Sequence, residues 1–319
     1  MNTYQPDILG KDFERMSFEL KDDYEGKVIT TLIRKKTPSS TGKAILYIHG
    51  FNDYFFQEEE AERFISEGYD FYAIDLRKYG RSLLPHQRFN NCRRLEEYFS
   101  DIDNCLLRIG NEGIKNITLV AHSTGGLISA LYLSQPGKHS LISSVIFNSP
   151  FLAMNLPLLL DKFAIPIVSF FGRYFPDISI KASLPSAYGE SIHKDYKGEW
   201  DFNTHWKPIQ PSAVNFGWIR AIHEGHKKIR KGIELRIPIL LLTSGCSTNY
   251  KNKPSDKDFR ADGVLDVEKL HKAGKKIRTE KGIRIERIEK GLHDLALSHQ
   301  EARDRYYHII FDWLKEQKS

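Results

Sequence analysis

The stretch Ile117-Thr-Leu-Val-Ala-His-Ser-Thr-Gly-Gly-Leu-Ile-Ser129 decides the fold of this chain. Its first half is an apolar, β-branched run typical of a buried strand, and residues 126–133 have the apolar spacing of a helix. Between the two lies only His122-Ser-Thr-Gly125, which leaves no room for a loop, so the chain has to turn sharply at Ser123. A turn of this kind forces the residue at its apex into a strained backbone conformation and exposes its side chain.

The turn resembles the nucleophile elbow, whose usual pattern is G-x-S-x-G, except that Ala121 stands at the first glycine. That position needs a small side chain because strand and helix crowd there, and a methyl group meets this need. The alternative is an ordinary strand-to-helix turn in which Ser123 caps the helix. A base, an acid and an oxyanion site elsewhere in the chain would favour the elbow.

The rest of the chain alternates apolar strands with helices. The predicted strands cover residues 16–20, 28–33, 44–48, 71–75, 145–147, 237–242 and 283–288. The predicted helices cover residues 57–66, 95–109 and 300–315. The first two strands are expected to form an antiparallel pair at a sheet edge. The others predict βαβ units, and hence an α/β fold with a mostly parallel sheet flanked by helices.

This rhythm breaks between Phe151 and about Gly232, where Pro, Trp and Phe are frequent. We therefore predict a core formed by residues 1–150 and 233–319, with residues 151–232 inserted as a helical cap, or lid. A length of 319 residues suits one α/β domain with such an insertion, and 40% apolar residues can form a sizeable core.

The bulk properties exclude several classes of protein. The net charge is +6, and its excess lies in residues 227–231 and 272–290, which we interpret as solvated faces rather than a nucleic-acid or anionic-membrane patch. Since no RNA-binding signature or aromatic–basic pattern accompanies them, no nucleic-acid partner is expected. Three scattered cysteines favour a reducing compartment over a disulfide framework.

No segment predicts secretion or membrane insertion. Residues 1–15 are polar and lack the apolar region of a signal peptide. The most apolar stretch, residues 151–175, is interrupted by Asp161, Lys162, Arg173 and prolines, which a bilayer span does not tolerate. The expectation is a soluble, cytoplasmic protein.

A serine nucleophile needs a general base that is oriented by a carboxylate. In a parallel α/β sheet, functional groups gather beyond the carboxyl ends of the strands. His293 follows the last predicted strand and is the best placed of the twelve histidines. The acid should follow the strand at 237–242, where Asp256, Asp258, Asp262 and Asp266 all qualify by order. Asp262 is preferred because it lies in a loop before a short helix, whereas Asp266 suits the first turn of that helix.

The oxyanion needs preorganised backbone N–H donors. One candidate is the N–H of Thr124, directly after the nucleophile at the start of its helix. The other is the N–H of Phe51, because Gly50 allows the backbone after the strand at 44–48 to turn toward the site. We expect the ring of Phe51 to line the pocket, and His49 to hold this loop in place rather than to act in catalysis.

At this point the chain is identified as similar to α/β-hydrolases of the monoacylglycerol lipase, lysophospholipase and serine aminopeptidase (S33-like) group. The matching pieces span most of the chain and are His49-Gly-Phe51, Asp75-Leu-Arg-Lys-Tyr-Gly-Arg-Ser82, His122-Ser-Thr-Gly-Gly126, Ala261-Asp-Gly-Val-Leu-Asp266 and Gly291-Leu-His-Asp294. The resemblance implies a triad of Ser123, Asp262 and His293, and a lid inserted after the sixth strand. Dehalogenases and epoxide hydrolases of this fold have an aspartate at the elbow, against which Ser123 argues. No metal or nucleotide motif is present, so no cofactor or metal is expected.

The cap carries more apolar surface than its own core requires. This favours an apolar acyl ester, such as an acylglycerol or a lysophospholipid, with Phe51, Phe151 and Met154 as substrate-binding candidates. It also makes the cap a candidate for peripheral membrane contact, although the surface has an alternative use in packing onto the core. An aminopeptidase would need acids in the cap to bind an ammonium group, for which Glu190, Glu199 and Asp201 are candidates. A non-catalytic binding protein that retains the fold is the third alternative. The sequence leaves the oligomeric state open.

Overall fold

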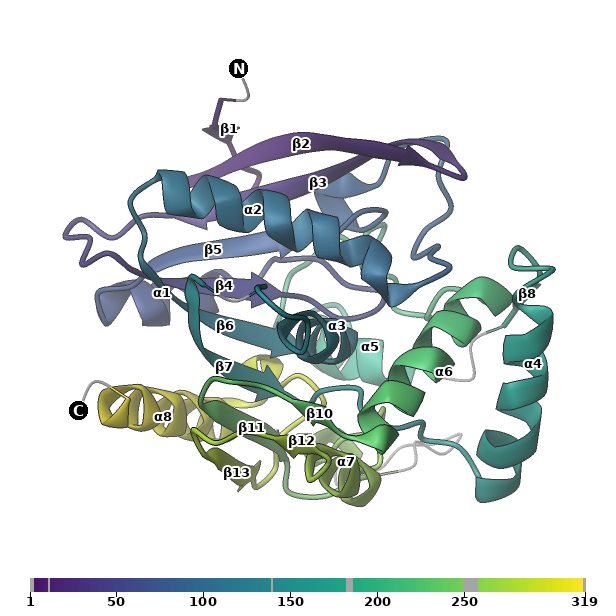
Figure 1. Cartoon of the computed structure of the whole chain (residues 1–319). Helices are drawn as coiled ribbons and strands as arrows, with labels where there is room; N and C mark the ends of the chain where they lie inside the picture. The colour runs from purple at the N-terminus through teal and green to yellow at the C-terminus, as the bar shows by residue number, and fades with distance from the viewer. Residues whose placement is uncertain (1–2, 11, 139, 182–185, 249–257, 318–319) are drawn as a thin grey trace.

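The computed structural model describes residues 3–10, 12–138, 140–181, 186–248 and 258–317. Within them, nine strands form one sheet in the order β1-β2-β3-β5-β4-β6-β7-β11-β13 (Figure 1). These strands are β1 (Gln5–Pro6), β2 (Phe13–Asp23), β3 (Gly26–Lys35), β4 (Lys43–Ile48), β5 (Asp70–Asp75), β6 (Asn116–His122), β7 (Ile142–Asn148), β11 (Ile239–Ser244) and β13 (Ile283–Ile288).

The pairing confirms the predicted fold class. From β5 to β13 every neighbouring pair is parallel, whereas β3 pairs antiparallel with β5 and β2 pairs antiparallel with β3. The two-residue strand β1 adds to the outer side of β2, so the predicted edge pair is one strand removed from the edge. Parallel strands buried on both faces require continuous apolar runs, and this is why the sequence showed them clearly.

Helices cover both faces of the sheet. In β4, Ala44, Leu46 and Ile48 face one apolar cluster, and Ile45 and Tyr47 face the other. The first cluster contains side chains of α2 (Phe99–Asn111), α3 (Thr124–Leu133), α6 (Phe216–Lys231) and α7 (Val267–Gly274). The second contains side chains of α1 (Glu58–Ser66) and α8 (Gln300–Glu316). The predicted helix at 95–109 is divided into a 3₁₀ turn, η2 (Leu95–Tyr98), and α2, because helices commonly begin with a 3₁₀ turn.

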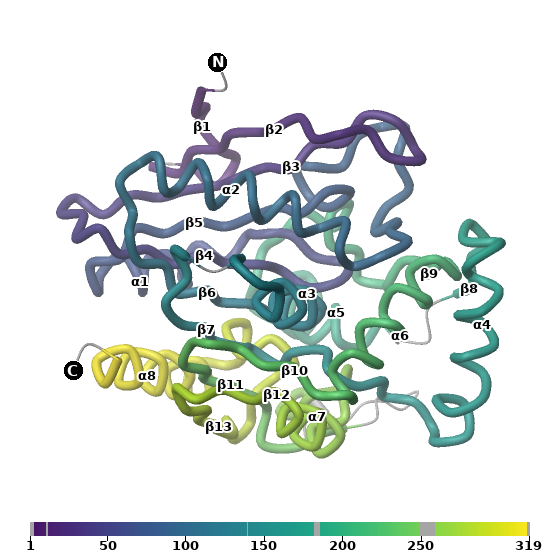
Figure 2. The backbone as a smooth tube through the Cα atoms, viewed as in Figure 1, coloured from purple at the N-terminus to yellow at the C-terminus, as the bar shows by residue number. Residues whose placement is uncertain are grey.

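After β7 the chain leaves the sheet and returns to it at β11, as the tube in Figure 2 shows. This excursion contains the π-helical turn η3 (Leu160–Ala164), α4 (Ile165–Phe171), α5 (Ala187–Ile192), α6, and the two-residue strands β8 (Ser179–Ile180) and β9 (Val214–Asn215). α6 packs its Ile219, Ile222 and Ile229 into the apolar cluster of the sheet, whereas α4 contacts α6 from outside. The segment predicted as a cap therefore joins the core through α6 and also through a third apolar cluster, in which Ile192 and Phe202 pack against core residues that include Tyr54 and Leu292.

The remaining elements are short. They are η1 (Gly80–Ser82), η4 (Asp258–Arg260), η5 (Leu295–Leu297), β10 (Ile233–Glu234) and β12 (Ile277–Arg278), the last two forming a separate parallel pair. Among the residues that the structure describes, no helix combines the length and apolar character that crossing a membrane requires.

Candidate active site

Ser123 lies at the junction of β6 and α3 with φ 50° and ψ −119°. A positive φ is rare for a residue with a side chain, and such strain persists only where the surroundings hold it. Here the N–H of Ser123 donates to the carbonyl of Asn148 at 3.0 Å, and its own carbonyl accepts from the N–H of Phe151 at 2.8 Å. The conformation is that of an elbow, not that of an ordinary N-cap, and no capping bond from the Ser123 side chain is present.

The crowding around the elbow explains its small residues. A Cβ on Gly125 would lie 2.4 Å from the carbonyl oxygen of His49 and 2.5 Å from that of Ile48, so only glycine fits there. Ala121 lies opposite Ile48 on one side and Phe147 on the other and is fully buried. Its methyl group is accommodated, so the replaced glycine of the usual pattern does not prevent the turn.

The structure brings the three predicted triad residues together. The Nε2 atom of His293 lies 2.9 Å from Ser123 Oγ, and its Nδ1 atom lies 2.9 Å from Asp262 Oδ2. With Nδ1–H donating to the carboxylate, Nε2 is left as an acceptor for the serine hydroxyl. All three side chains are buried. This chain of two bonds has the geometry of a nucleophile, a general base and an orienting acid.

Asp262 is held firmly by its own turn. Its Oδ1 accepts the N–H groups of Val264 and Leu265, each at 2.8 Å, which leaves Oδ2 for His293. Backbone pairing with Cys246 and Thr248 places the residue directly after β11, despite the long segment between them.

The other acid candidates do not share this position. Asp266 is the N-cap of α7, where its side chain accepts the N–H of Lys269 at 3.0 Å. Asp256 and the side chain of Asp258 lie outside the described residues.

The loop after β4 presents a backbone N–H group to the site. His49 Nδ1 donates to the carbonyl of Gly50 at 2.7 Å, while its Nε2 accepts the N–H of Leu76 at 3.1 Å. Burial lowers the pKa of His49, which keeps the ring neutral as this pattern requires. Since the peptide is planar and trans, fixing the Gly50 carbonyl directs the N–H of Phe51 the opposite way. Among the described residues, neither this N–H nor that of Thr124 has a hydrogen-bond partner.

A cavity of about 330 Å³ opens in front of Ser123 and is within the size range of ligand sites. The predicted substrate-binding residues Phe51, Phe151 and Met154 all line it. So does Trp218, whose ring centroid lies 4.6 Å from that of Phe51. The other apolar lining residues are Leu156, Ile165, Ile180, Ile192, Phe202, Pro208, Ile209, Pro211, Val214, Ile219, Val264 and Leu265.

The acids that an aminopeptidase would need are not in this cavity. Among the described lining residues the one carboxylate is Asp53, and the Nζ of Lys207 already pairs with it at 2.7 Å. The three cap acids are engaged elsewhere: Glu190 with Ser186, Glu199 with Arg303 and Asp201 with Lys194. The wall therefore lacks an unpaired acid for a substrate ammonium group, as far as the structure describes it.

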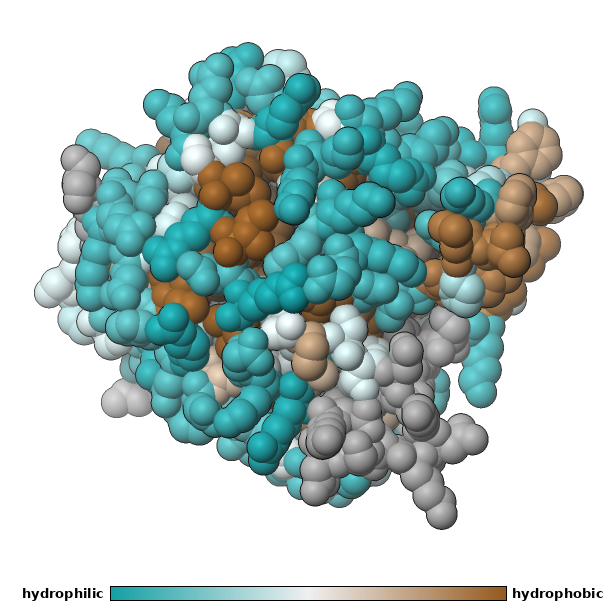
Figure 3. Space-filling model, turned by 90° about the horizontal axis from the view of Figure 1, so that it is seen from below, coloured by the Kyte–Doolittle hydropathy of each residue, from teal (hydrophilic) through white to brown (hydrophobic). Residues whose placement is uncertain are grey.

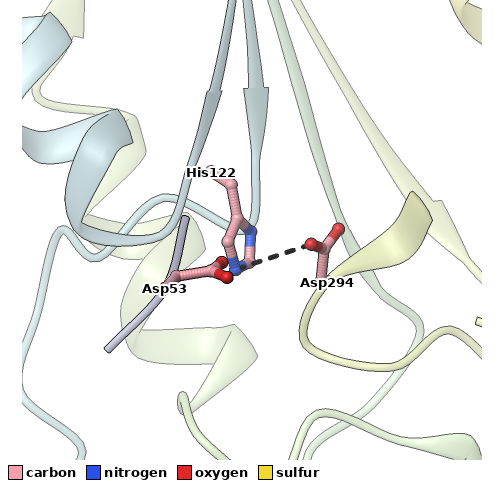
Figure 4. A group of neighbouring side chains, drawn as sticks. All are labelled: Asp53, His122 and Asp294. Carbon is pink, nitrogen blue, oxygen red and sulfur yellow. Dashed lines mark ion pairs between the residues drawn. The ribbon is translucent and has the colours of Figure 1, made fainter. Parts of the chain in front are cut away.

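Sequence reasoning missed the polar group beside the elbow. Figure 4 shows Asp53, His122 and Asp294 pointing toward one another, and their ligand atoms lie within 4.8 Å. His122 Nδ1 donates to the Asn148 carbonyl at 3.2 Å, and burial holds the pKa of His122 well below its usual value. Although such a trio has the ligand types of a metal site, a cation there would lie beside the Lys207 ammonium.

We interpret the trio as a hydrogen-bonded support of the elbow. Asp294 accepts from Asn148 and Gln57 at 2.8 and 3.3 Å. Asp53 was detectable from its place directly after His49-Gly-Phe-Asn52, but no sequence signal marked its partner Lys207.

His226 on α6 holds the cavity wall and makes stability depend on pH. Its Nε2 donates to the Phe151 carbonyl at 2.8 Å, while the buried Nδ1 has no partner among the described residues. Burial lowers its pKa to about 4. Between pH 4 and 6.5 the unfolded chain therefore binds a proton that the folded chain excludes, so this group's contribution to stability falls as pH falls.

We expect His226→Gln to remove this pH-dependent contribution to the free energy of unfolding, because glutamine keeps a hydrogen-bond donor but does not titrate. The contribution is on the order of 3 kcal/mol at most. Urea unfolding of wild type and variant at pH 7 and pH 4.5 measures it as a difference. His205 is exposed, so His205→Gln is the control and should leave the pH dependence of the free energy of unfolding unchanged. An equal pH dependence in wild type and His226→Gln would contradict the assignment.

Comparison with known structures gives the same fold. The chain resembles a soluble variant of monoglyceride lipase from Saccharomyces cerevisiae, solved with a substrate analogue, at 16% identity and a TM-score of 0.69, covering 94% of this chain and 96% of that one. Monoacylglycerol lipase from Paleococcus ferrophilus matches at 18% identity and a TM-score of 0.64, covering 90% and 99%. At such identities the likeness shows the fold alone.

Comparison at the level of sequence gives one curated relative and one family model. Lysosomal thioesterase PPT2-B of Xenopus laevis is 25% identical over 148 residues, which are 43% of this chain and 49% of that protein. The chain thus matches about half the length of this curated relative. The model of the family described as serine aminopeptidase, S33 matches residues 39–297, a range that includes the elbow, Asp262 and His293. On this evidence the chain belongs to the serine aminopeptidase S33 family of α/β hydrolases.

Proposed function

We propose that this protein is a serine hydrolase that cleaves carboxylic esters with an apolar acyl group. The observation that carries the proposal is the pair of 2.9 Å contacts linking Ser123, His293 and Asp262 at the wall of a mainly apolar cavity. Serine is a weak nucleophile without a base, so this arrangement has a direct chemical use.

The reaction proceeds through an acyl-enzyme. Ser123 Oγ attacks the ester carbonyl while His293 Nε2 takes the hydroxyl proton, and Asp262 stabilises the imidazolium that forms. The N–H groups of Phe51 and Thr124 hold the oxyanion, aided by the positive end of the α3 dipole. His293 then gives its proton to the departing alkoxide, which leaves as the alcohol. Water, deprotonated by His293, attacks the acyl-enzyme, releasing the carboxylic acid and restoring Ser123.

The cavity favours an ester over a peptide N-terminus. Its lining is mainly apolar, and its described carboxylate, Asp53, is neutralised by Lys207. The acyl group of an acylglycerol or a lysophospholipid suits such a wall. A second candidate is a thioester, favoured by the sequence match to a thioesterase; the same steps would then release a thiol.

A substrate panel tests the proposal. We expect hydrolysis of p-nitrophenyl esters to increase from acetyl to longer acyl chains, with turnover of monoacylglycerol and little of proline p-nitroanilide. A fluorophosphonate probe should label Ser123, and Ser123→Ala should abolish labelling. Turnover of the anilide without turnover of any ester or thioester would instead assign an aminopeptidase. Failure of folded protein to react with both probe and panel would favour the non-catalytic alternative.

A further inference from the structure

The outer side of the cap presents an unusual number of large apolar side chains to solvent. We call this surface the apolar cap face; its residues are Leu158, Leu159, Leu160, Phe163, Ile167, Phe170, Phe171, Tyr174, Phe175, Ile178 and Ile180. In Figure 3 brown side chains gather at the right-hand edge, the side on which α4 lies in Figure 1. Leu159 is 70% exposed and Phe163 is 63% exposed. Soluble monomers rarely leave a contiguous patch of this kind uncovered.

The helix at its centre, α4, packs Ile165 and Val168 against the apolar cluster of the sheet but leaves its other large apolar residues exposed. The buried residue of α4 is Ser169, whereas its Ile167, Phe170 and Phe171 are exposed. Directly after it, a Cβ on Gly172 would lie 2.3 Å from the carbonyl oxygen of Phe216, so the small residues face α6 at close range. Globular helices place their apolar stripe toward the core. Here Ile167, Phe170 and Phe171 project outward, an arrangement that suits a helix with a further partner outside this chain.

Three exposed cations accompany this surface, whereas one acid, Asp161, lies beside them in η3. Lys162, Arg173 and Lys181 are exposed, and none of the three forms an ion pair with a carboxylate among the described residues. The acid Asp177, in contrast, lies 3.3 Å from Arg88 and 3.5 Å from Arg93. Long basic side chains beside apolar ones reach anionic headgroups while the apolar groups enter the acyl region.

The apolar cap face borders the cavity in front of Ser123. Ile165, in the first turn of α4, lines that cavity. Ile180 lines it as well and is also 44% exposed, so it belongs to both surfaces. One apolar surface thus continues from the outside of the cap to the wall of the candidate active site.

We propose that the apolar cap face docks onto a lipid bilayer that contains anionic lipids. Leu159, Phe163, Phe170 and their neighbours enter the interface, and Lys162, Arg173 and Lys181 contact headgroups. A second copy of the chain fits less well, because a two-fold contact would bring this surface, with its cations, against itself. Docking in this orientation puts the cavity rim at the membrane, where apolar esters would enter. The docking itself does not depend on the proposed function.

Vesicle sedimentation tests the proposal. The probes are vesicles of phosphatidylcholine alone and vesicles with about one third phosphatidylserine. We expect wild type to bind the anionic vesicles, and Leu159→Ser/Phe163→Ser/Phe170→Ser to reduce the partition coefficient by at least about tenfold. Lys162→Glu/Arg173→Glu should remove most of the preference for phosphatidylserine. None of these residues lines the cavity, so hydrolysis of a water-soluble butyrate ester should be unchanged in both variants.

Two control variants show whether binding is specific to the cap. Ile8→Ser/Leu107→Ser changes exposed apolar residues beside β1 and on α2, away from the cap, and should bind like wild type. Ser123→Ala should also bind like wild type, whether or not the enzymatic proposal holds. Absence of wild-type binding, or equal binding by the triple serine variant, would overturn the proposal. So would a wild-type dimer in sedimentation equilibrium that the triple variant converts to a monomer, since a second copy would then cover this surface.

Discussion

Replacing Ser123 with alanine is expected to lower kcat for ester hydrolysis by about four orders of magnitude or more. The reason is that the attacking atom is lost, while the oxyanion donors and the cavity can supply only the remaining acceleration. Stability should change little, because Ser123 is held in its positive-φ conformation by backbone bonds to Asn148 and Phe151. Steady-state kinetics on a p-nitrophenyl ester and a thermal unfolding curve measure the two effects.

A double variant provides the internal control for this prediction. Since the triad residues act as a unit, Ser123→Ala combined with His293→Ala should be hardly less active than Ser123→Ala alone. Two losses that multiply would mean that the residues act independently. Ester turnover that survives in Ser123→Ala at the wild-type rate would reject Ser123 as the nucleophile.

The second large effect is expected from Asp262→Asn, which should lower kcat by about four orders of magnitude at neutral pH. An asparagine can keep its oxygen toward the N–H groups of Val264 and Leu265. Its NH₂ group then faces His293 Nδ1 and donates to it. The imidazole proton moves to Nε2, where it faces Ser123 Oγ and prevents acceptance of the hydroxyl proton.

Asp266→Asn is the matched control in the same turn. The Asp266 carboxylate caps α7, and asparagine is an equally good N-cap, so activity and stability should both be retained. A loss of kcat in Asp266→Asn as large as that in Asp262→Asn would mean that the acid has been assigned to the wrong residue.

Local patterns in the sequence were sufficient for most of the fold. Strands β4, β5, β6, β7 and β11 are buried on both faces, so each had to be a continuous apolar run, and the predicted runs match them to within two or three residues. The sharp turn at Ser123 was also predictable, because the strand passes directly into a helix, whereas the choice between an elbow and an ordinary N-cap needed the backbone conformation of Ser123. His293 could be selected from twelve histidines by position alone, because it lies in the loop after β13 and functional groups gather beyond the carboxyl ends of parallel strands.

Other features depend on residues that are far apart in the sequence. Asp262 and Asp266 look alike as acids near a short helix, and only backbone pairing with Cys246 and Thr248 assigns one to His293 and the other to α7. Lys207 pairs with Asp53 across more than 150 residues, so no local pattern could join them.

The apolar cap face shows most clearly the difference between what the sequence determines and what tertiary packing determines. The sequence by itself determined that residues 158–180 are rich in apolar side chains and are interrupted by charges. Only the tertiary structure decided which way those side chains point, because Gly172 and Ser169 let α4 approach α6 closely and turn its large residues outward. Composition records how much apolar surface a segment carries. Whether that surface is buried is settled by packing against elements that are distant along the chain.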